Sequence, residues 1–181
     1  METTQIKSGQ SLYPARVKEV FLSADKGKVA GKLLPTNEIF VEELGPELIK
    51  FKIKGYSQKK SPNIIYFKEG LRIISISFAK AQMPEITTLK EGEGSEAYDE
   101  VELSAWTDFA DFSMDLKGLF AYAKTTYDEN CSMCHSLHAE SHYNAAQWPN
   151  LFKSMVGRTG IDKDDIYLVT QYLQKHSSDI K

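Results

Sequence analysis

The sequence predicts an α+β protein of two small domains, an all-β domain followed by an all-α domain. Short runs in which apolar and polar residues alternate fill much of the first half of the 181-residue chain. The alternation fades in an acidic stretch with two glycines, and apolar residues then recur at helical spacing. We therefore expect a β domain over 12–90, an acidic linker or loop over 91–102 and a helical domain over 103–181.

The composition is that of an ordinary globular protein, with 41% hydrophobic and 26% charged residues. The net charge of −3 is too small to favour a nucleic acid or an anionic membrane as the partner. No apolar run approaches the ~20 residues of a membrane span. The polar start of the sequence also lacks the apolar core of a signal peptide. We therefore expect neither a nucleic-acid partner nor a membrane span in this chain.

The strongest strand signal lies in residues 48–55, where two isoleucines and a phenylalanine alternate with three lysines. This period of two is typical of a half-buried strand. Two further β-rich runs, 63–68 and 71–79, flank Glu69 and Gly70, and a two-residue connection with glycine predicts a hairpin. Together with shorter runs before them, these segments make five short strands without an intervening helix. That arrangement predicts a small barrel or sandwich.

The predicted linker is the most acidic part of the chain. Six carboxylates crowd around Gly92 and Gly94: Glu91, Glu93, Glu96, Asp99, Glu100 and Glu102. A charge run of this kind is typical of a solvated segment, and the alternative is an acidic landing site for a basic partner. We place the domain boundary here and expect a protease to cut first within 80–102.

Three helices are predicted after the linker. Apolar residues recur at helical spacing over 116–127. A second helix is expected over 149–156, because it begins with a proline and is followed by Gly157. The last helix carries an apolar stripe and ends near His176.

Both cysteines of the chain fall in one C-x-x-C-H motif, which consists of Cys131, Cys134 and His135. This spacing is used for covalent attachment of c-type haem, in which the two thiols add to the haem vinyl groups. The histidine then becomes an axial ligand of the iron. A structural zinc site needs more thiol or imidazole ligands than this motif offers, and a thioredoxin-type motif needs a βαβ context. We therefore expect one covalently bound haem c per chain.

The order of helix, haem motif, short helix and terminal helix is the plan of a class-I-like cytochrome c domain. Haem is normally attached to C-x-x-C-H outside the bacterial cytoplasm. We therefore expect a periplasmic protein, with a signal peptide or membrane anchor lying outside this sequence.

The residues leave the second axial ligand open, with Met155 favoured. This methionine shares the apolar face of the short helix, and a thioether raises the reduction potential relative to a second imidazole. Methionine is also a common core filler, so an open iron is a further alternative. The candidate ligands besides Met155 are His138, His142 and His176, and the predicted haem pocket consists of Trp148, Leu151 and Phe152.

Several segments carry a resemblance to a known family: 127–135, 141–143, 147–149, 171–176 and, in the first half, 55–58. They resemble the carboxy-terminal monohaem region of the pentahaem c-type cytochromes that serve trimethylamine N-oxide reductase, or a free-standing monohaem relative. The β half is similar to a bacterial SH3-like barrel. The resemblance covers about 12–176, and it departs from the family in having a single C-x-x-C-H and no membrane helix.

The resemblance implies electron transfer without catalysis. The acceptor would be a periplasmic molybdopterin N-oxide or sulfoxide reductase, and the donor a membrane-anchored quinol-oxidising cytochrome. The β half would act as an interaction or positioning module. The alternatives are a haem-based gas or redox sensor with an open distal site and, with less support, a peroxidase that uses His138 or His142.

Overall fold

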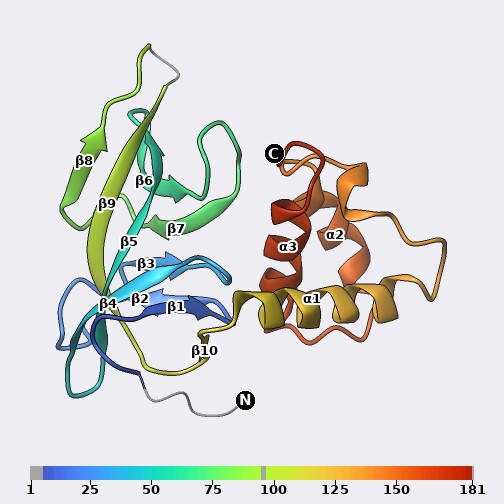
Figure 1. Ribbon diagram of the computed structural model, residues 1–181, viewed down its shortest axis with the longest axis horizontal. Coiled ribbons are helices and arrows are strands. Elements are labelled where there is room, and N and C mark those ends of the chain that lie inside the picture. Colours follow the sequence, from blue (N-terminus) through green and yellow to red (C-terminus); the bar gives the residue numbers. More distant parts are fainter. Residues whose placement is uncertain (1–5, 95–96, 181) are drawn as a thin grey trace.

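The computed structural model describes residues 6–94 and 97–180. Figure 1 shows two regions side by side: a β region of residues 6–113 and a helical region of residues 115–180. Within the described residues the strands are β1 (Ser11–Pro14), β2 (Lys18–Val20), β3 (Gly31–Leu33), β4 (Ile39–Leu44), β5 (Ile49–Gln58), β6 (Ser61–Tyr66), β7 (Ile74–Phe78), β8 (Ile86–Lys90), β9 (Tyr98–Thr107) and β10 (Phe112–Ser113). The helices are α1 (Leu116–Cys131), the 3-10 turn η1 (Glu140–His142), α2 (Trp148–Val156) and α3 (Ile166–Lys175).

The strands form one curled antiparallel sheet in the order β10-β1-β4-β5-β6-β7-β3-β2. β9 lies along β5 and pairs with it from Tyr98 to Thr107, and β8 pairs with β9 on its other side. An isolated bridge between Phe21 and Trp106 joins the chain just after β2 to β9. Because β9 already pairs with β5, this bridge brings the far end of the sheet back to its centre and encloses the apolar core.

β5 confirms the strand that the sequence predicts most strongly. Ile49, Phe51 and Ile53 are buried, whereas the alternating lysines are half-buried or exposed. Lys52 forms ion pairs with Glu42 at 3.4 Å and with the β9 residue Glu102 at 3.1 Å. The hairpin that was expected at Glu69-Gly70 does pair β6 with β7, but a longer connection, residues 67–73, joins the two strands.

The predicted fold class is wrong. The chain is mostly β, with ten strands and only three short α-helices among the described residues, so no all-α class-I cytochrome c domain follows an SH3-like barrel. The physical reason lies in β9, where Val101, Leu103 and Ala105 are buried between outward-facing polar residues. This period of two is hidden in the sequence because its first part lies within the acidic run.

The stretch expected to be a linker over 91–102 contains the first half of β9. Glu100 and Glu102 lie on this strand opposite Tyr56 and Lys54 of β5. Their charge keeps one side of the strand solvated while the other side packs. That the β region and the helical region are separable domains stays a prediction.

The helical region has its own core, in which α3 packs against both α1 and α2. The buried residues include Leu119, Ala123, Trp148, Phe152 and Leu173. No helix in the described part of the chain is both long enough and apolar enough to cross a membrane.

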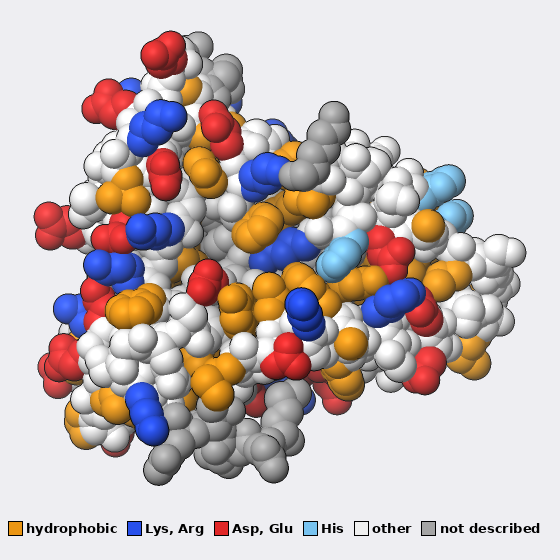
Figure 2. All heavy atoms as spheres, viewed as in Figure 1, with side chains coloured by type: hydrophobic (Ala, Val, Ile, Leu, Met, Phe, Trp, Pro, Cys, Tyr) orange, Lys and Arg blue, Asp and Glu red, His pale blue; other side chains and the backbone are white. Residues whose placement is uncertain are grey.

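α3 joins the two regions through buried polar side chains. Gln171 Nε2 donates to Ile74 O at 3.0 Å, and Lys175 Nζ donates to Thr36 O at 2.9 Å. A cavity of about 540 Å³ lies beside this contact, and its lining includes Asn37 and Phe67. Figure 2 shows hydrophobic side chains gathered over the middle of the molecule, where the sheet meets the helices.

Candidate haem-attachment site

α1 delivers the first cysteine of the motif. Asp115 caps its start by accepting a hydrogen bond from Gly118 N at 3.0 Å. Every fourth residue along one face of the helix is buried: Leu119, Ala123, Tyr127 and Cys131. Cys131 therefore ends the stripe that faces the core and is 8% exposed, whereas Cys134, beyond the helix end, is exposed.

A cavity of about 100 Å³ lies at this end of α1. It is lined by Asn130, Cys131, Cys134, His135, Met155, Arg158 and Thr159. The end of α1 and the turn that follows it supply two thiols and an imidazole, and the end of α2 supplies a thioether. These are the donor types that hold haem c covalently and ligate its iron on two sides, so the residues present fit that group.

The ring of His135 has a defined hydrogen bond. Its Nδ1 lies 2.8 Å from the carbonyl oxygen of Ser136. Because a carbonyl oxygen only accepts, Nδ1 must carry the hydrogen in this contact, which leaves the lone pair on Nε2. An imidazole held in this way is the form that ligates a metal through Nε2.

The histidines that the sequence offers as alternative ligands lie in two places. The rings of His135, His138 and His142 lie in a row. The centroid of the His138 ring is 5.4 Å from that of His135 and 5.2 Å from that of His142. His176 lies at the end of α3, where its ring packs on Phe120 at 4.9 Å and its Nδ1 contacts Tyr172 O at 2.7 Å. Only Met155, of the four candidates, lines the cavity that contains both cysteines.

The three predicted pocket residues do not line this cavity. Trp148 and Phe152 are buried in the helical core, and Leu151 is half-buried. Trp148 packs edge-on against Tyr127 at 6.1 Å, and its Nε1 donates to Glu140 O at 2.8 Å. In this structure both tryptophan contacts support α1 and the loop that follows it.

The thiol of Cys131 is shifted toward its protonated form. Burial raises its pKa, and the neighbouring charge of Asp128 acts in the same direction. A buried thiol held neutral does not ionise readily, so oxidation of this cysteine is disfavoured in the folded chain.

Sequence reasoning missed three residues of the cavity wall: Asn130, Arg158 and Thr159. Asn130 directly precedes the motif, and its Nδ2 donates to Thr126 O at 2.9 Å. Thr159 Oγ1 donates to Val156 O at 2.7 Å, which fixes the turn after α2. No motif marks these positions, although two of them lie within four residues of Met155.

Comparison with known proteins places these observations in a family. The chain is 26% identical over 176 residues to "Cytochrome c-type protein TorC" of Escherichia coli O157:H7, an alignment that covers 95% of this chain and 45% of the relative. It is 26% identical over 183 residues to "Cytochrome c-type protein TorY" of Haemophilus influenzae, covering 97% of this chain and 48% of the relative. The chain thus spans about half the length of these relatives. No solved structure matches it.

A family model described as "TorC third cytochrome c domain" matches residues 6–112, which is more than half of the chain. The matched stretch is nearly the whole β region, and the C-x-x-C-H motif follows it within the part that the TorC and TorY alignments also cover. The chain therefore belongs to the TorC third cytochrome c domain family of c-type cytochromes.

Proposed function

We propose that this chain is a monohaem electron carrier that delivers electrons to a periplasmic molybdopterin N-oxide or sulfoxide reductase of the trimethylamine N-oxide reductase type. The observation that carries the proposal is the convergence of two thiols, one imidazole and one thioether on a single cavity. Membership of a c-type cytochrome family supports the same reading. When bound, haem c supplies an iron that changes between the ferric and ferrous states and so takes up and releases one electron.

The residues of the cavity have distinct roles in this proposal. Cys131 and Cys134 hold the group covalently, so it stays bound in both oxidation states. His135 would ligate the iron through Nε2, because its Nδ1 is used by the Ser136 carbonyl. Met155 would supply the second ligand, and a thioether stabilises the reduced state more than an imidazole does.

The electron donor in this proposal is a membrane-anchored quinol-oxidising cytochrome. The family resemblance of the sequence supports both partners and a periplasmic location. Contacts between redox partners are usually small, with less than ~1,200 Å² buried, so the complexes should be transient. The protein itself performs no chemistry on the substrate of the reductase.

A reoxidation experiment tests the proposal. The haem-loaded protein is reduced, mixed with the cognate molybdopterin reductase, and followed by its visible absorption. We expect reoxidation only after trimethylamine N-oxide or a sulfoxide is added. Binding of carbon monoxide by the ferrous protein at neutral pH, with no reoxidation by the reductase, would instead support the sensor function and refute the carrier.

The matched control is a variant that lacks one of the two attachment thiols. Cys134→Ala removes the exposed thiol of the motif, which has no role in the helical core. This variant should fold, but covalent haem attachment should be impaired, so the yield of haem-loaded protein and the reoxidation signal should both fall.

A further inference from the structure

The segment that follows the haem motif is long and has little regular structure. Between the end of α1 at Cys131 and the start of α2 at Trp148, η1 (Glu140–His142) is the only described helical element. This segment contains Ser136, whose carbonyl accepts the hydrogen bond from His135. The segment therefore carries the hydrogen-bond acceptor that orients the His135 ring.

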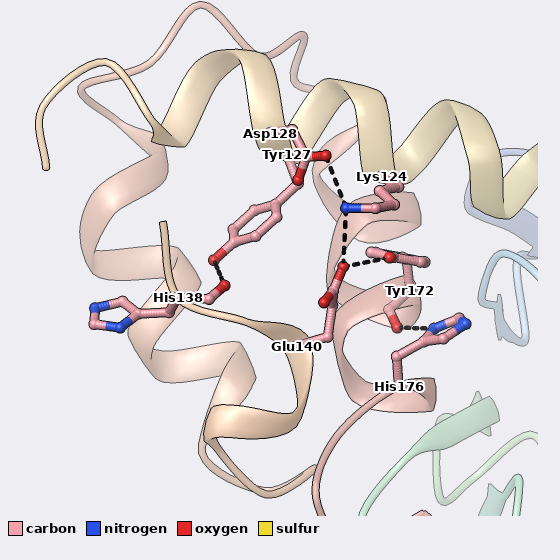
Figure 3. Close-up of polar contacts among 7 residues, drawn as sticks. All are labelled: Lys124, Tyr127, Asp128, His138, Glu140, Tyr172 and His176. Atoms are coloured by element: carbon pink, nitrogen blue, oxygen red, sulfur yellow. Dashed lines mark hydrogen bonds and ion pairs between the residues drawn. The ribbon is translucent and has the colours of Figure 1, made fainter. Parts of the chain in front are cut away.

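Two backbone contacts hold this segment to the helical core. Tyr127 Oη donates to His138 O at 2.9 Å, and Trp148 Nε1 donates to Glu140 O at 2.8 Å. Both donors belong to buried aromatic residues, so the bonds are shielded from water. Figure 3 shows the Tyr127 hydroxyl reaching the backbone of the segment from α1.

The side chain of Glu140 adds a third attachment, and it joins two helices at once. Its Oε1 accepts a hydrogen bond from Tyr172 Oη of α3 at 2.5 Å and lies 3.4 Å from Lys124 Nζ of α1. Lys124 also pairs with Asp128 at 2.8 Å. The Glu140 side chain is only 22% exposed, so it is better shielded than an ordinary surface ion pair. Figure 3 shows this carboxylate between the two helices.

We propose that Glu140 is a positioning residue for the haem site. It holds the segment 136–143 against α1 and α3, and this keeps the Ser136 carbonyl in place behind His135. The segment also contacts His135 through a ring, because His138 lies in it and the centroid of the His138 ring is 5.4 Å from that of His135. This inference rests on the proposed haem attachment.

The chemical consequence concerns the strength of the proximal ligand. An imidazole whose Nδ1–H donates to a carbonyl is more basic, and it stabilises the oxidised iron more strongly. Release of the segment weakens that hydrogen bond and should raise the reduction potential. Removal of a nearby negative charge also raises the potential, so the test must separate positioning from charge.

The test compares reduction potentials of four haem-loaded variants with that of the wild type. Glu140→Gln removes the charge but keeps an acceptor for Tyr172. Glu140→Ala removes both, and Tyr172→Phe removes the hydrogen bond without changing any charge. Glu129→Gln is the charge control, because Glu129 is exposed on α1 and lies two positions before Cys131.

We expect Glu140→Ala and Tyr172→Phe to raise the potential more than Glu140→Gln and Glu129→Gln do. The expected excess is up to a tenfold change in the ratio of reduced to oxidised protein, which is about 59 mV for one electron. Amide hydrogen exchange over 136–143 should become faster in the same two variants. If Glu140→Ala does not fold, Tyr172→Phe alone decides the question.

Equal shifts in Glu140→Gln, Glu140→Ala and Glu129→Gln, with no shift in Tyr172→Phe, would show a charge effect and refute the positioning role. That result leaves the proposed function intact. Absence of covalent haem in the wild type would refute the proposed function instead, so the two failures are distinguishable.

Discussion

Lys175 at the end of α3 gives the structure its most quantitative test, because its ammonium group is buried without an opposite charge among its bonding partners. The residue is 8% exposed. Its Nζ donates to Thr36 O at 2.9 Å, Thr36 Oγ1 at 3.1 Å and Asn37 Oδ1 at 3.0 Å. It also lies 4.2 Å from the centre of the Phe67 ring. All of these partners are neutral, so desolvation dominates its electrostatics.

Burial lowers the pKa of Lys175 from 10.5 to about 7. A change of this size corresponds to roughly 5 kcal/mol between the two protonation states. Between pH 7 and 10.5 the unfolded chain holds a proton at this residue that the folded chain has released. The free energy of unfolding therefore rises with pH through this window, and below pH 7 the full cost of the buried charge is present.

The perturbation is Lys175→Met, which removes the titration and keeps an apolar stem of similar length. Unfolding by urea is followed by circular dichroism at pH 7 and pH 9 in the haem-loaded wild type and variant. Linkage predicts that wild-type stability relative to the variant increases by about 2 kcal/mol from pH 7 to pH 9. All other groups titrate in both proteins and cancel in this difference.

Lys163→Met is the matched control, because Lys163 is exposed just before α3. Its stability relative to the wild type should not change between the two pH values. If the difference between the wild type and Lys175→Met is equally constant, then Lys175 keeps its proton in the folded chain and the reasoning from desolvation is wrong.

Three further predictions concern the haem site and the fold. Cys131→Ala and Cys134→Ala should each impair covalent haem attachment, which the mass of the denatured protein measures. Met155→His should keep a low-spin haem but lower its potential, and Met155→Ala should let the ferrous protein bind carbon monoxide; an unchanged near-infrared spectrum in Met155→Ala would point to a histidine ligand. Leu103→Ala should destabilise the protein by about 2–5 kcal/mol in urea unfolding, because this β9 residue is 3% exposed in the core.

Local sequence patterns were sufficient to predict elements in which buried residues recur at one regular spacing or in which the ends are marked by proline and glycine. β5 was predictable because every second residue is apolar, and α2 because a proline and a glycine mark its ends. β9 was missed because Glu100 and Glu102 alternate with Val101 and Leu103, so a strand was interpreted as part of a charged linker. The contact between Phe21 and Trp106 joins residues far apart in the sequence and has no local signal.

The residues of the candidate site likewise divide into those that a local motif marks and those that no motif marks. Cys131, Cys134 and His135 share one local motif, so their convergence on one cavity was predictable from the sequence, whereas their attachment to haem stays a prediction. The positions of Arg158 and Thr159 on the cavity wall depend on the turn after α2 and on its packing beside α1, which no motif encodes. The role of Glu140 had no local signal either, because its partners are distant in the sequence. Lys124 of α1 lies 16 positions before it, and Tyr172 of α3 lies 32 positions after it.

The contact between α3 and the sheet determines how the family-matched β region relates to the haem site. Backbone carbonyls at the ends of strands and in turns are left without ladder partners, and burying them unpaired is costly. Three α3 side chains donate to such carbonyls: Gln171 to Ile74 O, Gln174 to Arg72 O and Lys175 to Thr36 O. Detaching α3 from the sheet would leave these side-chain donors and these backbone carbonyls without their hydrogen-bond partners. The same helix anchors Glu140 through Tyr172, so one element ties the loop behind His135 to the β region.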